Sequence, residues 1–238
     1  MSAIAKSIPK QVKFSTLSQL KQHAKDITQP TPQPEYKFGK LSNDQKAFLD
    51  RVIRVDQAGE LGANYIYAGQ HFVLSRTEPQ LKDLIQHMWD QEVHHHNTFN
   101  KLQAQRRVRP SILTPIWKVG AFGLGAVTAL ISKEAAMACT VAVETVIGGH
   151  YNDQLRVLNT KFNDIETTEV LSGKDETGSV ISNEVTELKD IIKTFRDEEL
   201  EHLDTAIEHD AESAVPYWLI TDVIKLTCKA AIFTAERV

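Results

Sequence analysis

Two Glu-x-x-His motifs, Glu92-Val-His-His95 and Glu199-Leu-Glu-His202, constrain this chain more than any other feature of its sequence. Residues three apart on a helix lie on the same face, so each motif directs a carboxylate and an imidazole toward one point. With nine histidines in the chain, composition alone would produce roughly 0.6 such pairs. The two motifs therefore indicate a metal site, but they need support from other residues.

Two further glutamates give that support. Glu144 is the only charged residue between Glu134 and His150, in a helical stretch where a carboxylate would be buried without compensation. Burying an unpaired carboxylate costs several kcal/mol, so a metal or another partner is expected. Glu60 lies among small residues, after Gly59 and shortly before Gly62-Ala63, which leave room beside the backbone.

The order along the chain is Glu, Glu-x-x-His, Glu, Glu-x-x-His, with one set on each of four successive helical segments. This order is an internal twofold repeat, and it is typical of the inward-facing ligands of ferritin-like di-iron proteins. Carboxylate and imidazole ligands suit iron or manganese. We therefore predict a two-metal centre with six ligands: Glu60, Glu92, His95, Glu144, Glu199 and His202.

Within this centre, Glu92 and Glu199 are predicted to bridge the two metals. His95 and Glu60 then complete one metal position, and His202 and Glu144 complete the other. The metals should lie within about 4 Å of each other.

Carboxylates outside the ligand set usually fix the orientation of ligating imidazoles. Glu198 and Asp56 are candidates for this task from their spacing, although either position also suits a surface charge. Tyr151 lies seven residues beyond Glu144, on nearly the same helix face. It is a candidate to relay electrons or protons, and the alternative is a packed core tyrosine.

Periodicity predicts helices from Ser42 (an N-cap, with Gln45 three residues later) to about 75, from Pro79 to Gln105, from Glu134 to Leu158 and from Asn183 to Asp210. Ser213 is a candidate cap for a last helix that ends near Arg237, and the polar segment 166–180 is predicted to be a surface loop. No strand signal competes. The fold class is therefore all-α: a ferritin-like four-helix bundle with an added apolar helix at a membrane interface and a C-terminal helix.

The first 34 residues form a separate segment. They carry five lysines and a single acid, Asp26, so the acidic excess behind the net charge of -4 lies in the rest of the chain. Residues 1–25 combine lysine and serine without acids, which is typical of an organelle transit peptide, although a disordered tail has similar composition. Prolines between 30 and 34 then predict an extended linker. We therefore divide the chain into a tail with its linker, 1–34, and a di-iron domain, 42–238.

Composition also excludes several classes. The acidic net charge gives no indication of a nucleic-acid partner. The two cysteines, Cys139 and Cys228, lie in apolar helical patterns, which indicates buried thiols rather than a disulfide framework or a zinc site.

An apolar, glycine-rich stretch, 119–132, follows a cationic segment that contains Arg106, Arg107, Arg109 and Lys118. Its 14 uncharged residues are few for a membrane span. The stretch is typical of a segment that dips into a lipid surface below a basic rim, and the alternative is a core helix or a subunit contact.

Several segments together resemble one family: Val-Asp-Gln-Ala-Gly-Glu60-Leu-Gly-Ala-Asn, Met-Trp-Asp-Gln-Glu92, Arg107-Val-Arg-Pro, Lys133-Glu-Ala-Ala-Met-Ala-Cys-Thr-Val-Ala-Val-Glu144 and Phe195-Arg-Asp-Glu-Glu-Leu-Glu-His202. They are similar to the demethoxyubiquinone hydroxylases of ubiquinone biosynthesis, from about residue 45 to the C-terminus. All six predicted metal positions hold the residue types of that family. The segment 160–182 resembles a fungal-type insertion.

The resemblance implies a monooxygenase that hydroxylates the ring of a polyprenylated demethoxyquinone with O2 and electrons from NADH, at two iron ions. Glu60, Glu92, Glu144, Glu199 and Tyr151 would then be catalytic. His150 and Tyr151 match a pair near the family's substrate and electron-transfer path. The implied location is the matrix face of the mitochondrial inner membrane, with a lipid-binding accessory protein and other members of a ubiquinone-synthesis complex as partners.

Two other readings of the residues stay open at this point. A ferroxidase or iron-storage bundle would use the same ligands without a quinone. A structural or lipid-binding bundle without metal would pair the six residues with one another.

Overall fold

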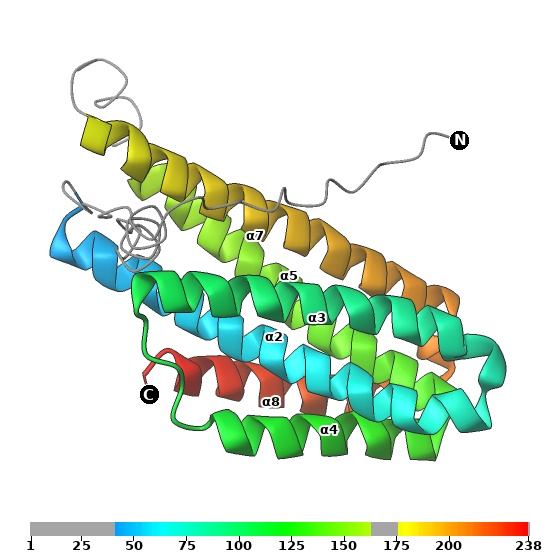
Figure 1. Cartoon of the computed structure of the whole chain (residues 1–238). Helices are drawn as coiled ribbons and strands as arrows, with labels where there is room; N and C mark the ends of the chain where they lie inside the picture. The colour runs from blue at the N-terminus through cyan, green and yellow to red at the C-terminus, as the bar shows by residue number, and fades with distance from the viewer. Residues whose placement is uncertain (1–40, 163–175, 238) are drawn as a thin grey trace, which may run out of the picture. The chain divides into compact units, whose positions relative to one another are not determined.

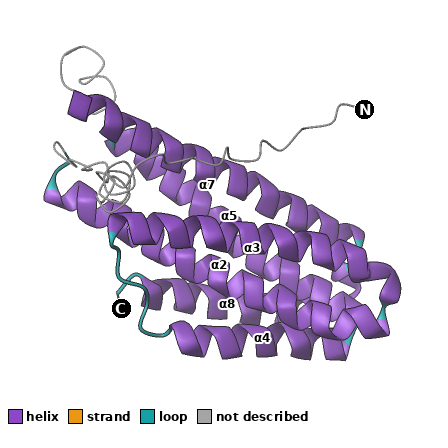
Figure 2. Ribbon diagram, in the orientation of Figure 1, coloured by secondary structure: helices purple, strands orange, loops and turns teal. Residues whose placement is uncertain are grey.

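The computed structural model describes residues 41–162 and 176–237, and all regular structure in these ranges is helical (Figure 2). Four long helices form a bundle: α2 (Asn43–Thr77), α3 (Lys82–Arg106), α5 (Lys133–Lys161) and α7 (Glu176–Glu208). Two more helices, α4 (Thr114–Ile131) and α8 (Tyr217–Ala235), pack mainly along α2 and α5, respectively (Figure 1). Short 3-10 turns are η1 (Pro79–Leu81) and η2 (Ala211–Ser213). The predicted all-α class is confirmed.

Local sequence signals explain where these helices begin and end. α2 begins with a capping box, in which the Ser42 hydroxyl accepts from the Gln45 backbone N–H and the Gln45 side chain accepts from the Ser42 backbone N–H. α3 ends at Arg106, and the next residue, Arg107, has a left-handed backbone with φ of 55°. Ser132 separates α4 from α5 and caps α5 by accepting from the Ala135 N–H. These signals determine where the helices that carry the predicted metal ligands begin and end.

Two predicted boundaries are wrong. The end of the expected loop, Glu176 to Val180, belongs to α7, because polar composition does not distinguish a loop from the outer turns of a helix. The rest of that loop, like the predicted tail and linker, lies outside the described residues. The last helix does not start after Ser213: η2 and Pro216 intervene, and α8 begins at Tyr217. Proline is suited to a helix start because it lacks an N–H donor.

The ligand positions lie between two apolar clusters of the bundle. On α2, Glu60 falls between Ile53 of one cluster and Tyr67 of the other. The predicted ligands on α3, α5 and α7 also lie between residues of these two clusters. The first cluster supplies Phe99, Tyr151 and Phe195 there, and the second supplies Met88, Val141 and Ala206. The centre is therefore closed by packed hydrocarbon on both sides along the bundle, which excludes water and strengthens electrostatic interactions inside it.

α4 approaches α2 closely through one glycine on each helix. A Cβ added at Gly125 would lie 2.0 Å from the Ile66 carbonyl oxygen, and one at Gly69 would lie 2.3 Å from the Phe122 carbonyl oxygen. No side chain larger than hydrogen fits at either crossing point without moving the backbones. This contact holds α4 against α2.

Much of the apolar surface of α4 and α8 is exposed. On α4 only Gly125, Thr128 and Ala129 are buried, whereas Val119 is 76% exposed. On α8 the exposed residues include Trp218, Val223, Leu226 and Phe233. Within the described residues, α4 is the one helix long and apolar enough to cross a membrane by length and composition, with 18 residues and a mean hydropathy of 1.3. The exposed face of α8 was not predicted from the sequence.

Candidate metal centre

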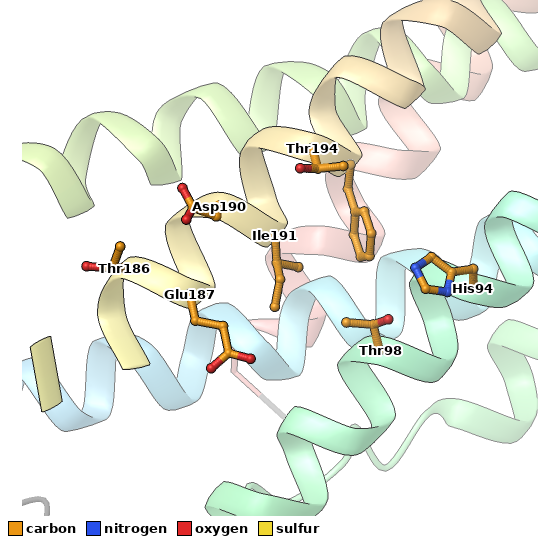
Figure 3. Close-up of a pocket in the computed structure, with 8 residues that line it drawn as sticks. His94, Thr98, Thr186, Glu187, Asp190, Ile191 and Thr194 are labelled. Atoms are coloured by element: carbon orange, nitrogen blue, oxygen red, sulfur yellow. The ribbon is translucent and has the colours of Figure 1, made fainter. Parts of the chain in front are cut away.

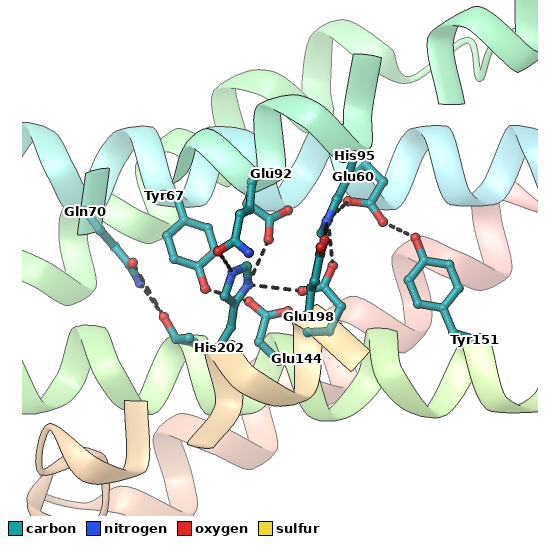
Figure 4. Close-up of polar contacts among 12 residues, drawn as sticks. Glu60, Tyr67, Gln70, Glu92, His95, Glu144, Tyr151, Glu198 and His202 are labelled. Carbon is teal, nitrogen blue, oxygen red and sulfur yellow. Dashed lines mark hydrogen bonds and ion pairs between the residues drawn. The ribbon is translucent and has the colours of Figure 1, made fainter. Parts of the chain in front are cut away.

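The six predicted ligands meet at one point in the middle of the bundle (Figure 4). Glu60 comes from α2, Glu144 from α5, and each of the two motifs from α3 or α7. Each of the six residues is at most 1% exposed. The helix register therefore turns four carboxylates and two imidazoles into the bundle interior, as their spacing predicts.

The six residues form two overlapping groups, in each of which one ligand atom per residue lies within 4.8 Å of the others. Glu92 and Glu199 belong to both groups. The remaining members are Glu60 and His95 in the first group and Glu144 and His202 in the second. This is the same grouping that the sequence predicts, with Glu92 and Glu199 common to both groups.

The chemistry of these atoms fits divalent metal ions. The Nδ1 atom of His95 lies 3.4 Å from Glu60 Oε2 and 3.2 Å from Glu199 Oε1. The Nδ1 atom of His202 lies 3.2 Å from Glu92 Oε1 and 3.3 Å from Glu199 Oε2. None of these atoms has a hydrogen-bond partner, and neither have Glu92 Oε2 and Glu144 Oε2. Buried polar atoms are nearly always partnered, so a set of unpartnered oxygen and nitrogen atoms facing one another is a site that can hold cations.

The pKa values of these residues also indicate a site that needs positive charge. Burial raises the pKa of Glu92 and of Glu144 well above the usual value, and the nearby Glu199 carboxylate raises both further. Burial opposes protonation of His95, but contacts with Glu199 and Glu60 raise its pKa to about 12. Burial also acts to raise the pKa of Glu199, but His202 and His95 lower it to about 2. Four carboxylates so close together require compensating positive charge, from protons or from cations.

Two buried tyrosines hold the two outer glutamates. The Tyr151 hydroxyl on α5 donates to Glu60 Oε1 on α2. The Tyr67 hydroxyl on α2 donates to Glu144 Oε1 on α5, at 2.9 Å. Tyr67 was not predicted from the sequence. Its position seven residues after Glu60 repeats the position of Tyr151 after Glu144, and this spacing was the signal that could have identified it.

The outer nitrogens of the two imidazoles are also partnered. His95 Nε2 lies 2.5 Å from Glu198 Oε2, as predicted for Glu198. His202 Nε2 lies 3.0 Å from Gln91 Oε1, a residue that the sequence analysis missed. Because the Glu198 carboxylate and the Gln91 carbonyl oxygen can only accept, the Nε2–H of each ring donates to its partner.

Asp56 does not have the predicted role of orienting a ligand imidazole. Its Oδ1 accepts from Gln154 Nε2 at 2.6 Å and lies 3.7 Å from His150 Nε2. Asp56 is on α2 one helical turn before Glu60, but on this side of the bundle the nearest imidazole belongs to His150. Burial raises the pKa of Asp56 well above the usual value.

An apolar cavity of about 540 Å³ lies next to the centre, between α2, α4, α5 and α8. Its lining includes Glu60 and Tyr151 on the side of the centre. Other lining residues are mainly apolar, among them Ile66, Trp117, Leu124, Ile147 and Ile232. The cavity therefore joins the carboxylate cluster to the side of the molecule where the exposed apolar faces of α4 and α8 lie.

A second hollow, between α3 and α7, has a different lining (Figure 3). It is a more open groove that contains His94, Thr98, Thr186, Glu187, Asp190 and Thr194. At its inner end Phe195 stacks on the His95 ring, with 3.9 Å between ring centroids. This packing separates the groove from the carboxylate cluster.

Fold and site together define an all-α bundle with a buried carboxylate and imidazole centre that can hold a pair of cations beside an apolar cavity. The chain belongs to the family of the ubiquinone biosynthesis protein COQ7, whose model matches residues 47–235. These residues include all six members of the centre and both tyrosines.

Named relatives agree with this membership. The chain is 60% identical to the mitochondrial 5-demethoxyubiquinone hydroxylase of Saccharomyces cerevisiae over 94% of both chains. It is 49% identical to the human mitochondrial NADPH-dependent 3-demethoxyubiquinone 3-hydroxylase, over 83% of this chain and 81% of the human one. A bacterial relative, the 3-demethoxyubiquinol 3-hydroxylase of Rhodospirillum rubrum, is 44% identical over 81% of this chain and 79% of its own. The resemblance inferred from the sequence is confirmed, and the mitochondrial names agree with the predicted location.

Proposed function

We propose that this chain is a 3-demethoxyubiquinol 3-hydroxylase, a di-iron monooxygenase that hydroxylates the ring of a polyprenylated demethoxyubiquinone. The observation that carries the proposal is the union of two features: a buried six-ligand centre, and an apolar cavity that reaches it through Glu60 and Tyr151. A quinone ring with an isoprenoid tail needs both. The names of the relatives supply the substrate class and the reaction.

Two iron ions would be held by Glu60, His95 and Glu144, His202 at the outer positions, with Glu92 and Glu199 shared between them. Bound there, the ions would supply the activation of O2 and the two-electron chemistry of the hydroxylation. The protein's own contribution is to fix the ligands, through the tyrosines and the Glu198 and Gln91 contacts. The two apolar clusters keep water from competing with the substrate.

The substrate ring would enter the apolar cavity and stop against Glu60 and Tyr151. The Tyr151 hydroxyl would pass a proton between Glu60 and the cavity, a role supported by its bond to Glu60 and by its position in the cavity lining. His150 lines the same cavity, next to Gln154 at 2.8 Å. We assign to His150 and Tyr151 the contacts with the substrate on its path to the centre.

Electrons would come from a nicotinamide nucleotide. NADH was expected from the family resemblance, and the names of the human and other relatives specify NADPH. The location would be the matrix face of the mitochondrial inner membrane. A lipid-binding accessory protein and other members of a ubiquinone-synthesis complex would be the protein partners.

The exposed apolar faces of α4 and α8 would lie in the lipid surface, where the isoprenoid tail of the substrate is dissolved. We expect the protein to float with liposomes that contain anionic lipid, and either Val119→Glu on α4 or Leu226→Glu on α8 to reduce flotation several-fold. Both side chains are about 70% exposed or more, so an added charge should not disturb the fold but should oppose insertion into lipid. His87→Glu, at an exposed position on α3, adds the same charge away from this surface and serves as control. Flotation of both apolar-face variants equal to that of the control would contradict the membrane assignment.

The direct test is a reconstituted reaction. Protein loaded with Fe(II) is mixed with a demethoxyubiquinone, O2 and either NADH or NADPH, and the products are separated by mass. We expect a product heavier by one oxygen atom, with 18O incorporated from 18O2. An iron-loaded protein that oxidises Fe(II) repeatedly and leaves the quinone unchanged would instead support the ferroxidase alternative. A protein that binds no metal would support the structural bundle.

A further inference from the structure

The internal repeat extends beyond the six ligands. Glu60 and Tyr67 on α2 correspond to Glu144 and Tyr151 on α5, and each tyrosine donates to the glutamate of the other helix. Each half of the bundle therefore supplies the tyrosine that holds the outer glutamate of the other half. The outer glutamates have the same type of partner in both halves.

The imidazoles are held in the same way, each by a residue from the other half of the repeat. The residue immediately before the shared glutamate of each motif holds the histidine of the other motif. Gln91, before Glu92, accepts from His202. Glu198, before Glu199, accepts from His95 (Figure 4). The positions correspond, but the residue types do not: one acceptor is a neutral amide and the other is a carboxylate.

This difference matters for metal binding because the outer partner tunes an imidazole ligand. When Nε2–H donates to a carboxylate, electron density moves into the ring and makes Nδ1 a stronger base than donation to an amide does. The His95 contact at 2.5 Å is also shorter than the His202 contact at 3.0 Å. The ring of His95 is fully buried, whereas Glu198 is 31% exposed, so part of the carboxylate stays hydrated while its bond to the ring is shielded.

We propose that Glu198 makes the two metal positions unequal, so that the position of His95 and Glu60 binds a divalent cation more tightly than the position of His202 and Glu144. The proposal rests on the metal pair of the proposed function. It predicts stepwise filling, in which one ion enters on the His95 side before the second enters on the His202 side. It also makes Glu198 a positioning residue, which acts on the metal only through His95.

The test titrates the metal-free full chain with Fe(II) alone under argon and follows binding by calorimetry. For the wild-type protein we expect two resolved affinities. In Glu198→Gln the tighter affinity should fall about 10–100-fold, the range for loss of an outer partner of a metal-binding histidine, and approach the weaker one. In Gln91→Glu the weaker affinity should rise toward the tighter one. Glu201→Gln, the same change at an exposed position of α7, should leave both affinities unchanged.

A spectroscopic readout separates this effect from general damage to the site. At half an equivalent of 57Fe(II) per pair of positions, Mössbauer spectra of the wild type should show one quadrupole doublet, and full loading should add a second. Glu198→Gln should show both doublets already at partial loading. If Glu198→Gln and Gln91→Glu both keep the two wild-type affinities, the inference is wrong, even if the protein hydroxylates the quinone. If the wild type binds no iron, the proposed function itself fails.

Discussion

Glu144→Ala is expected to abolish hydroxylation while the helical bundle stays folded. Glu144 is fully buried and belongs to one ligand group only, with His202 and the two shared glutamates. Its loss therefore removes one carboxylate from the His202 position and leaves the His95 position with all its own ligands. We expect one Fe(II) to bind per chain with nearly wild-type affinity and the second to bind much more weakly. Turnover should fall below detection because the chemistry needs both ions.

The stability of this variant should depend on metal. Without metal, the alanine removes a carboxylate that is costly to bury, but it leaves the Tyr67 hydroxyl without its acceptor. An unpartnered buried donor costs about 1–3 kcal/mol, so the two effects oppose each other. With metal, each site held at a hundred times its Kd adds about 2.7 kcal/mol, and the variant should lose one such increment. Thermal unfolding with and without Fe(II) measures both quantities.

A second variant at this position separates charge from packing. Glu144→Gln keeps an acceptor for Tyr67 and keeps the volume, so without metal it should be at least as stable as the wild type, and it should still fail to hydroxylate. Thr145→Ala, at the exposed neighbouring position, should retain activity. Normal hydroxylation by either Glu144 variant would contradict the assignment of this residue.

The meeting of the six residues at one centre was predictable because helical spacing and burial act locally. The three-residue spacing within each motif is enough to place a carboxylate and an imidazole on one face. The absence of other charges around Glu144 is enough to show that it lies inside the bundle. Neither conclusion required knowledge of which helices are neighbours.

The contacts outside the ligand set depended on tertiary neighbours, and the prediction was less complete there. Glu198 and Asp56 had equal standing from spacing, but only Glu198 faces an imidazole ligand. Gln91 and Tyr67 are residue types that have many roles in helices, so their presence alone indicated nothing. The internal repeat contained the missing information, since each corresponds to a residue already singled out in the other half.

The apolar surface shows a second limit. The composition of the stretch that forms most of α4 indicates an apolar segment, but α8 contains charged residues, among them Asp222 and Lys225, and its sequence predicts only a C-terminal helix. The structure shows that Trp218, Leu226 and Phe233 are exposed on it. Whether an apolar helix face is exposed or covered depends on tertiary packing. The sequence pattern of an amphipathic helix is the same in both cases.

Gly125→Ala is expected to destabilise the protein and to disturb the substrate cavity, although alanine is the better helix former. The new Cβ would lie 2.0 Å from the Ile66 carbonyl oxygen and 2.8 Å from its carbonyl carbon. These are backbone atoms of α2, so no side-chain rotation relieves the clash and α4 must move away. Overpacking of this kind costs about 1–3 kcal/mol. Gly123→Ala, two residues away, meets no atom within 4 Å and should gain about 0.5–1 kcal/mol from helix propensity.

The same chemical change on one helix should thus have opposite effects on the free energy of unfolding, measured by chemical denaturation at fixed metal content. Because Ile66 and Leu124 both line the cavity, a displaced α4 should also raise the KM for the quinone in Gly125→Ala, while the iron affinities stay near those of the wild type. The ligands lie on α2, α3, α5 and α7 and do not depend on α4 for their register. Equal stability of the two variants would show that α4 does not pack on α2 in the way described. A loss of iron binding in Gly125→Ala would show instead that α4 supports the centre and not only the cavity.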